Sequence, residues 1–537
     1  MTSTFFGLEL SHRALASQQA ALNITGHNIS NANTQGYSRQ IANLTPTTPD
    51  TVPIAGRNLS LGSGVTLDTI TRARDAFVDR QFRGETSKQQ YWAARQDSLT
   101  KVEDILNEPS DNSLSHDMNQ FWTSWSDLSK DPENMGARAV VSERAQTLAD
   151  SFHNIAQQVS DMKGNMDATI KVQVHQINIY SEQIKNINDQ IKRAEVSGDN
   201  PNDLRDQRDS LVDDLSKIVS VRVVETKDQS FTDRNVNNYK LLIGDENAPN
   251  NILVDNSTFR LLKDPPPQEM INGFNSSQIV WSDDPGPILK TVVLGPKLGK
   301  LSANIDVRDT YLRDFGKQFD MLAQGIADAV NALHQTGQGL KAEGIVGIDF
   351  FTGASASTPP ALPVVTAATI NLNSVIVQDV NRIATGTIPL DTTPVPPLPP
   401  THVLDVNGKP LVTAGDGIIS QGISSLSSGW NALKSLITAG KFGAPGQNPV
   451  SASSLGDYYG ANVAQMGVDD QQANRMKAGE DVLVTNVMNQ RESLSGVSLD
   501  EEMTNLIKFQ KSYAAAARMV TMMDDMLSTI MNMGITR

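Results

Sequence analysis

The stretch that decides the fold is LDEEMTNLIKFQKSYAAAARMVTMMDDMLSTIM, residues 499–531. Its apolar side chains recur every three or four residues, which places them on one stripe of an α-helix. This stripe consists of Leu499, Met503, Leu506, Tyr513, Ala517, Val520, Leu527 and Met531. A helix with a single apolar stripe needs a partner to cover it, so this segment predicts a helix that packs against another helix.

A second, thinner stripe lies at the other end of the chain. Leu8, Leu15, Leu22 and Ile29 recur every seven residues, which is the spacing of a coiled-coil seam. The two stripes favour terminal helices that pair with each other or with other chains. The alternative is that both stripes simply complete a monomeric helical bundle.

The two ends are also nearly neutral. Residues 1–45 contain one Glu and two Arg, and residues 498–537 contain five acidic and four basic side chains, so the middle of the chain carries the whole net charge of −15. A nearly uncharged end can pack against copies of itself without repulsion, while an acidic middle stays solvated.

The C-terminal segment has its own start signal and an unusual composition. Ser498 and Glu501 form the S-x-x-E pattern of a capping box. Seven of the 17 methionines fall in the last 40 residues, which suits either a surface that meets several partners or ordinary core filling. Because ordering the ends costs conformational entropy that only a partner can offset, we expect both ends to be disordered in the monomer and to fold on assembly.

Between the ends, helical patterns alternate with strand patterns. The predicted fold class is α+β and multidomain, with paired terminal helices that form a coiled coil on assembly, a rod-like bundle of long helices, and two inserted β-rich domains. The predicted boundaries are 1–45 with 498–537 for the terminal domain, 46–220 with 301–344 and 416–497 for the helical core, 221–300 for the first insertion and 345–415 for the second.

Composition excludes several classes of function. The acidic balance argues against a nucleic-acid partner, and no stretch reaches the roughly 18 apolar residues of a membrane span, so no membrane insertion is expected. The first residues lack the basic and apolar regions of a signal peptide. The absence of cysteine excludes disulfides and thiolate zinc sites. No pair of histidines has helical metal-ligand spacing. We expect no enzyme, cofactor or metal.

The acidic run at 199–209 also fails as a calcium loop. Pro201 stands where a ligand belongs, and no Gly follows at the required spacing. A charged helix start is the better interpretation, with Arg205 and Arg208 able to pair with Asp209 or with neighbouring residues.

Four segments resemble known families. The segment 22–40 resembles the N-terminal signature of bacterial flagellar axial proteins, and three others, 201–209, 330–337 and 495–513, resemble the family of the first flagellar hook-associated protein. The residues that carry the first three resemblances include Asn28, Asn31, Asn33, Thr34, Gly36, Tyr37, Asp206, Arg208, Asp209, Asn331, His334 and Gly337. Gln35 stands where the family usually has Pro, which loosens one turn. The resemblance does not cover 225–300 or 352–415.

The resemblance implies a structural adaptor subunit at the junction of the flagellar hook and filament, required for filament assembly. The implied partners are the flagellar hook protein, the second hook–filament junction protein, further copies of the chain in a ring of about one helical turn, and a dedicated export chaperone at the C-terminal helix. The implied location is the extracellular flagellum, reached through the flagellar type III apparatus without a cleaved signal peptide.

Three alternatives are open, and the first of them is also structural. The chain could be another axial protein of the hook or rod type, although the helical middle and the segments at 203–209 and 331–337 argue against it. It could act as a surface-exposed binding module through its β insertions. An enzyme carried in these insertions is not supported by paired carboxylates, a triad or a metal set.

Overall fold

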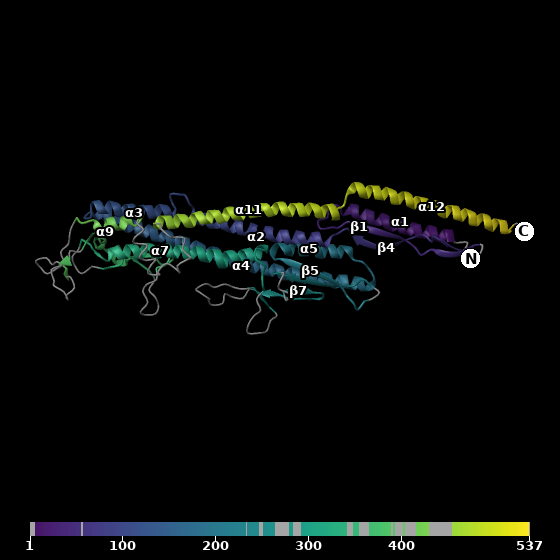
Figure 1. The fold of residues 1–537 in the computed structure, drawn as a ribbon, viewed down its shortest axis with the longest axis horizontal. Helices are drawn as coiled ribbons and strands as arrows, with labels where there is room; N and C mark the ends of the chain where they lie inside the picture. The colour runs from purple at the N-terminus through teal and green to yellow at the C-terminus, as the bar shows by residue number, and fades with distance from the viewer. Residues whose placement is uncertain are drawn as a thin grey trace.

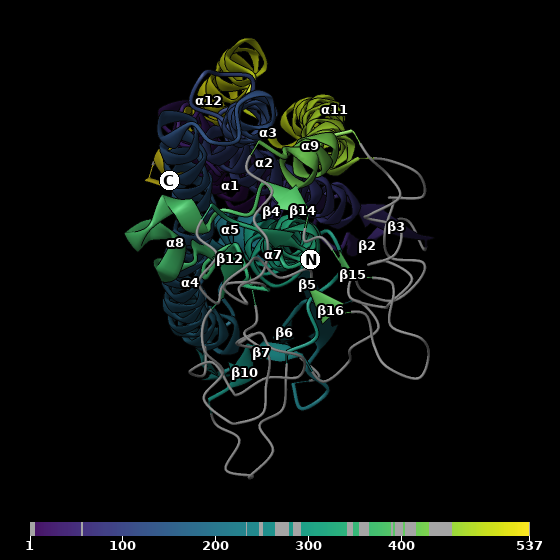
Figure 2. The same ribbon diagram turned by 90° about the vertical axis from the view of Figure 1, so that its left-hand side faces the viewer.

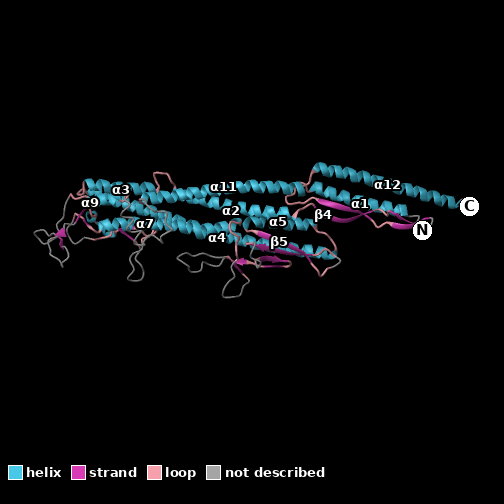
Figure 3. Ribbon diagram, in the orientation of Figure 1, coloured by secondary structure: helices cyan, strands magenta, loops and turns pink. Residues whose placement is uncertain are grey.

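The computed structural model describes residues 6–54, 57–231, 234–245, 251–263, 279–282, 292–340, 347–353, 365–387, 390–391, 401–402, 415–428 and 454–535. The molecule is elongated, with two terminal helices that extend from one end of a helical rod (Figure 1). The predicted fold class is confirmed, because the chain is mostly helical, its long terminal helices pack together, and small antiparallel sheets are inserted (Figure 3).

The terminal module contains α1 (Phe6–Ser30) and α12 (Leu499–Ile535), which pack along each other. The two helices run antiparallel, since Gly7 lies against Met523 whereas Asn28 bonds Glu502. A Cβ atom at position 7 would lie 2.4 Å from the Cε atom of Met523, so a larger residue there would require the end of the methionine side chain to move.

Strands cover the other face of α1. β1 (Gln40–Pro46) pairs antiparallel with β4 (Val65–Arg72), and β2 (Asp50–Ile54) forms a hairpin with β3 (Arg57–Leu61). The α1 residues that are buried are Ser11, Ser17, Ala21, Thr25 and Asn28. Small and polar side chains let the β4 backbone approach closely; the Ser17 hydroxyl donates to the Val65 carbonyl at 3.2 Å.

The rod is built around two antiparallel helices, α2 (Ala76–Leu106) and α11 (Leu455–Ser495). At one end Arg491 pairs with Asp79 at 3.1 Å, and at the other the Tyr459 hydroxyl donates to Glu108 at 2.8 Å. Helix α11 begins at a complete capping box formed by Ser454 and Asp457, which the sequence analysis did not identify.

One helix of 63 residues, α4 (Met135–Ser197), runs along the rod. It begins at Asn134, whose side chain accepts two backbone N–H bonds, and it ends at Gly198 in the left-handed conformation (φ 94°). The other helices of the rod are α3 (Leu114–Lys130), α5 (Asn202–Ile218), α6 (Gly299–Asp306), α7 (Leu312–His334) and α9 (Ile418–Ser425). A π-helical turn, Val307–Tyr311, joins α6 to α7.

The first insertion is a four-stranded antiparallel sheet in the order β5-β6-β7-β8. Its strands are β5 (Val221–Lys227), β6 (Asn237–Ile243), β7 (Ile252–Asp255) and β8 (Thr258–Phe259), and a two-stranded sheet of β9 (Leu262–Lys263) and β10 (Val280–Trp281) follows. Viewed along the rod, β6, β7 and β10 lie on the side away from α11 and α12 (Figure 2). The strands share one apolar core with α4 and α5, to which Ile177, Val212 and Leu241 contribute.

The described parts of the second insertion are short. They are β11 (Gly337–Gln338), β12 (Phe351–Thr352), β13 (Asn371–Leu372), α8 (Ser374–Gln378), a 3-10 turn (Val380–Arg382), β14 (Gly386–Thr387), β15 (Leu390–Asp391) and β16 (Thr401–His402). The pairs β11–β14, β12–β13 and β15–β16 are antiparallel. Phe350 and Phe351 pack against Phe121 and Trp125 of α3, so this segment is part of the larger core of the rod.

Candidate assembly site at the joint between the terminal helices and the rod

The terminal module meets the rod in one polar region, which we call the joint. It comprises Asn28, Tyr37–Gln40, Arg72–Arg83, Asp203–Asp213 and Arg491–Glu502. These segments come from both ends and the middle of the chain, so the joint is where the sequence signature and the terminal helices converge.

Asn28 is buried and uses all of its hydrogen-bonding capacity. Its Nδ2 donates to the Gln40 carbonyl at 2.9 Å and to the Glu502 carboxylate at 3.1 Å. Its Oδ1 accepts from the Tyr37 hydroxyl at 2.7 Å and from the Gln40 backbone N–H at 2.9 Å. One side chain therefore ties α1 to β1, to the signature turn and to the first turn of α12.

Tyr37 extends this network to the rod. Its hydroxyl donates to Asn28, so His27, whose Nδ1 lies 3.0 Å away, carries a proton on Nδ1 and donates to the Tyr37 oxygen. The Nε2 atom of His27 lies 3.8 Å from Asp203 at the start of α5. Burial, followed by the nearby Asp203 and Asp206 carboxylates, raises the pKa of Tyr37, which keeps its hydroxyl a donor.

The remaining signature residues shape the turn itself. The Asn31 side chain accepts from the Thr34 hydroxyl at 3.2 Å, and the Thr34 N–H bonds the Asn31 carbonyl at 2.9 Å. Gly36 has a φ of 80°, a conformation that favours glycine, and it faces Ser210 of α5. Asn33 is exposed.

Arg39 links the turn to the C-terminal helix. Its N–H donates to the Ser495 carbonyl at 2.9 Å, and its Nη1 pairs with Glu501 at 2.6 Å. The predicted capping box is therefore only half formed: the Glu501 N–H reaches the Ser498 hydroxyl at 3.5 Å, but the Glu501 carboxylate bonds Arg39 instead of turning back. The prediction was wrong in this part because an arginine 462 residues away offers a stronger, charged donor.

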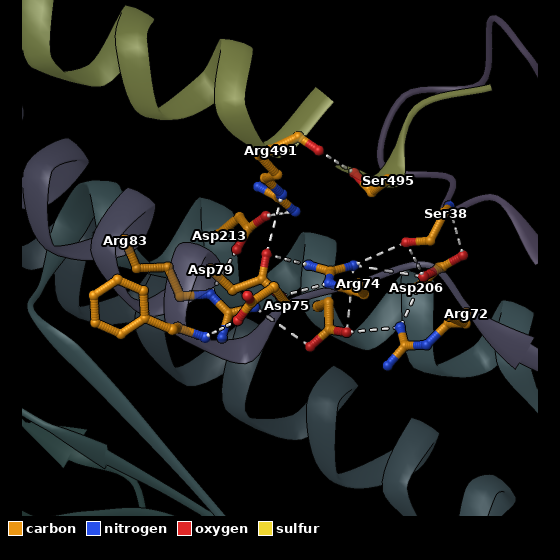
Figure 4. Close-up of polar contacts among 12 residues, drawn as sticks. Ser38, Arg72, Arg74, Asp75, Asp79, Arg83, Asp206, Asp213, Arg491 and Ser495 are labelled. Atoms are coloured by element: carbon orange, nitrogen blue, oxygen red, sulfur yellow. Dashed lines mark hydrogen bonds and ion pairs between the residues drawn. The ribbon is translucent and has the colours of Figure 1, made fainter. Parts of the chain in front are cut away.

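The centre of the joint is a set of ion pairs between α5 and the segment from the signature turn to α2 (Figure 4). Asp206 accepts from the Ser38 N–H at 2.9 Å and from the Ser38 hydroxyl at 2.8 Å. Arg72 places its Nη1 between Asp206, at 2.7 Å, and Asp209, at 2.8 Å. Arg74 lies beside the same two carboxylates and forms a bidentate pair with Asp79.

The surroundings of Asp209 keep it ionised although it is only 8% exposed. Burial on its own would raise the pKa of Asp209, but the guanidiniums of Arg74, Arg72 and Arg83 outweigh it and hold the pKa far below its usual value. The pairs are mutual, since the Asp213 and Asp209 carboxylates raise the pKa of Arg83 against the effect of its own burial.

The last turns of α11 enter the same network. Arg491 pairs with Asp79 of α2 at 3.1 Å and with Asp213 of α5 at 2.7 Å. Arg83 of α2 pairs with the other oxygen of Asp213 at 2.6 Å. Helix α11, which leads into α12, is therefore fixed to α2 and α5 at Arg491, four residues before it ends.

Arg205 and Arg208 have other partners than the one named first in the sequence analysis. Arg208 pairs with Glu225 of β5, and Arg205 pairs with Glu195 of α4 at 2.6 Å. The sequence analysis allowed Asp209 or neighbouring residues as partners, and the neighbours on α4 and β5 take that place, while Asp209 pairs with arginines from β4 and α2.

The segment from Asn331 to Gly337, which also carries part of the family resemblance, lies at the C-terminal end of α7. The Asn331 side chain accepts from the N–H groups of Phe350 and Phe351 and donates to the Phe351 carbonyl, each at 2.8 Å. A Cβ atom on Gly337 would lie 2.9 Å from the Cβ of Ala384, so glycine permits the contact of β11 with β14. Both residues hold the second insertion on the rod.

His334 packs at this helix end and is 1% exposed. Its Nδ1 donates to the Ile348 carbonyl at 2.9 Å, and its Nε2 accepts from the Ala384 N–H at 2.9 Å. Burial, with a smaller effect of the nearby Arg138 charge, lowers the pKa of His334 from 6.5 to about 4. The ring is therefore neutral at pH 7 and serves as donor and acceptor at once.

The two apolar stripes are divided between a covered and an open face. The half-buried members are Leu8, Leu15, Leu22, Ile29, Leu506, Tyr513, Ala517, Val520 and Leu527. The exposed members are Leu499, Met503 and Met531, and with them Ile507, Met519, Met522, Met526 and Ile530 are exposed. Helix α12 thus covers α1 with one side and keeps a second apolar side open.

The described residues contain no cluster of His, Cys, Asp or Glu that could hold a metal ion. Among the same residues, no helix is long and apolar enough to span a membrane. The joint offers ion pairs and hydrogen bonds between chain segments, and these are means of holding helices in place.

Two arginines of the joint, Arg74 and Arg491, were not identified from sequence. A weak signal existed, because Arg72 and Arg74, two residues apart, follow an extended run. Arg74 pairs with the nearby Asp79, but Asp206, the carboxylate that both Arg72 and Arg74 approach, lies more than 130 residues away, and no local pattern records such a pairing.

Comparisons with known proteins all give flagellar proteins. A family model described as the helical domain of flagellar hook-associated protein FlgK matches residues 99–351. Models described as the C-terminal part of flagellar basal body rod FlgEFG proteins and as flagella basal body rod protein match residues 488–533 and 8–37. The last two matches fall on the terminal helices.

Curated relatives match over almost the whole chain. Flagellar hook-associated protein 1 of Bacillus subtilis is 29% identical over 100% of this chain and 99% of its own length. The proteins of the same name from Escherichia coli and Salmonella typhimurium are 27% and 28% identical, each over 96% of this chain and 98% of their own length. The solved structure of the flagellar hook junction protein FlgK from Burkholderia pseudomallei has the same fold, with a TM-score of 0.57 at 16% identity, covering 78% of this chain and 100% of that chain.

Proposed function

Because this chain belongs to the family of flagellar hook-associated protein 1, we propose that it is the structural adaptor at the hook–filament junction and is required for filament assembly. The observation that carries the proposal is the terminal module. Two antiparallel helices cover each other on one side, present an open apolar side, and are fixed to a rigid rod through the joint. Such a module holds its outer surface at a defined angle for the next subunit.

The open side of α12 gives this adaptor its partners. The exposed apolar residues 503, 507, 519, 522, 526 and 530 leave a surface that a neighbouring helix can cover. The partners are the flagellar hook protein on one side, the second junction protein on the other, and further copies of this chain in a ring of about one helical turn. The methionines among these residues suit a surface that first meets an export chaperone and then neighbouring subunits.

The location follows from the same role. The subunit acts in the extracellular flagellum, which it reaches through the flagellar type III apparatus without a cleaved signal peptide.

The first insertion is not a free binding module, since its strands share a core with α4 and α5. Removal of residues 225–300 would open that core, so adhesion is better tested with substitutions on the exposed faces of its strands.

Deletion of the gene is expected to leave hooks without filaments, because no surface would connect the two. Filament subunit should then be found unassembled in the medium. Electron microscopy of the deletion strain, with the intact gene returned on a plasmid as the control, checks both outcomes. Normal filaments in the deletion strain would contradict the junction role.

Before assembly, we expect the terminal helices to be far less stable than the rod. Hydrogen exchange of the isolated monomer should show fast exchange in α1 and α12 and slow exchange in α4, because the open side of α12 has no partner. In the assembled state the amides of α1 and α12 should become protected. Strong protection of α1 in the monomer would rule out folding on assembly.

A further inference from the structure

Positive and negative charges are unequal in number around one cavity of the joint. Four guanidinium groups, those of Arg72, Arg74, Arg80 and Arg83, line this cavity together with three carboxylates, those of Asp79, Asp209 and Glu225. This local excess of one positive charge runs against the net charge of −15 of the whole chain. The cavity lining therefore lacks one negative group for charge balance.

The carboxylates of the joint have no acceptor oxygen without a partner. Both oxygens of Asp209 and both of Asp213 are bonded by Arg72, Arg83 and Arg491. In the same way, each oxygen of Asp206 and of Asp79 accepts from at least one donor, supplied by Ser38 or by arginines. These bonds use only part of the guanidinium N–H donors of the joint.

Several donors do remain, and they line one cavity. Arg72 bonds the carboxylates through Nη1 alone, Arg83 uses Nε and Nη2, and Arg80 has no polar partner within the described part of the chain. All three side chains line a cavity of about 330 Å³, together with Arg74. Arg83 and Arg74 are each 8% exposed at the side chain, so two of the four guanidiniums are already desolvated.

We propose that this cavity binds a carboxylate group. A guanidinium binds a carboxylate in a planar, bidentate fork. The bond is stronger where the guanidinium is already removed from water in the free protein. The walls also include Asp79, Asp209 and Glu225, but both oxygens of the first two already accept from arginines, and Glu225 pairs with Arg208. The ligand carboxylate is either a side chain of a neighbouring copy or a small free carboxylate. The first of these sources rests on the proposed function.

Titration of the full-length protein with sodium succinate tests the cavity. Sodium chloride at equal ionic strength is the reference, and isothermal calorimetry is the readout. Wild-type protein should bind succinate saturably, and Arg80→Gln should weaken this binding roughly tenfold, the effect of losing one charged hydrogen bond. Arg80 is exposed and has no structural partner, so this variant should melt at the wild-type temperature.

Arg475→Gln is the matched control, because Arg475 is an exposed arginine of α11 away from the cavity. It should bind succinate as the wild type does. Absence of saturable binding above the chloride reference, or equal binding by Arg80→Gln, would overturn the proposal. These readouts use isolated protein, so they do not depend on whether the chain acts at the junction.

Filament counts in the deletion strain then distinguish the two sources. If a neighbouring copy supplies the carboxylate, Arg80→Gln should lower the number of filaments per cell, while Arg475→Gln should not. If filaments are normal although Arg80→Gln has lost succinate binding, the ligand is a free carboxylate.

Discussion

Replacing Asp209 with asparagine is expected to destabilise the joint by about 3–5 kcal/mol, the cost of removing one partner from a buried group of ion pairs. The amide keeps the shape of the carboxylate but removes the negative charge, and its NH₂ group would face the guanidiniums of Arg72 and Arg83. Three arginines would then share the remaining carboxylates. Urea unfolding followed by circular dichroism measures the loss.

Asp214→Asn is the control on the same helix. Asp214 is 42% exposed and pairs with Lys217, a surface contact worth roughly 0.2–1 kcal/mol. If both substitutions cost the same, the ion pairs of the joint contribute no more than surface pairs, and the central role given to Asp209 fails. In cells, Asp209→Asn should also reduce filament assembly, since α2 and β4 would lose their common anchor.

Acidification is expected to loosen the second insertion through His334. The folded-state pKa of about 4 lies below the unfolded value of 6.5, so the unfolded chain takes up a proton first as the pH falls. The stabilising effect is complete above pH 6.5 and is lost as the pH falls towards 4, by about 3 kcal/mol at about 1.4 kcal/mol per pH unit. A protonated ring could not accept from the Ala384 N–H.

The measurement compares the melting temperature of wild type and His334→Gln between pH 7 and pH 4.5. Glutamine does not titrate, so the variant should be less stable at pH 7 but should lose less stability on acidification. His175→Gln, at an exposed position of α4, should follow the wild-type curve. Identical pH dependence in wild type and His334→Gln would show that the histidine plays no part in acid sensitivity.

Arg138 explains why this end of the rod is sensitive to charge. Its guanidinium is fully buried and donates to the carbonyls of Pro132 and Ile383 and to the Thr385 hydroxyl, at 2.7–2.9 Å. Burial lowers the pKa of Arg138 to about 10. A second positive charge on the nearby His334 ring would add repulsion in a region that already holds one cation.

The long helices could be predicted because their signals are local. The apolar period of α4 is sustained from Val141 to Ile191, and Gly198 marks its end. The helical core was expected to resume at residue 301, and helix α6 begins close to this position, at Gly299, and continues through a π-helical turn into α7. The segment 299–306 has few apolar residues, so packing of Leu301 and Ala303 decided its conformation.

The site was only partly predictable. Resemblance identified Asn28, Tyr37 and Asp209, but neither spacing nor composition shows that Arg72 would meet Asp209 or that Arg491 would meet Asp79 and Asp213. The heptad leucines of α1 were expected at the centre of a helix pair, yet they are half-buried, while Ser17 and Ala21 are buried. The reason is that β4 approaches α1 so closely that only small side chains fit, and sequence periodicity does not record the distance of a partner.

The hydrogen bond between Asn28 and Glu502 joins residues 474 positions apart, and this separation sets an order of events in folding. Closing a loop of that length from an unfolded chain costs on the order of 5 kcal/mol in entropy. Once α2 and α11 have packed and Arg491 has reached Asp79, the same contact becomes almost local and nearly free of that cost. The rod must therefore form first, and the terminal pair is the last part of the subunit to close and the first to open.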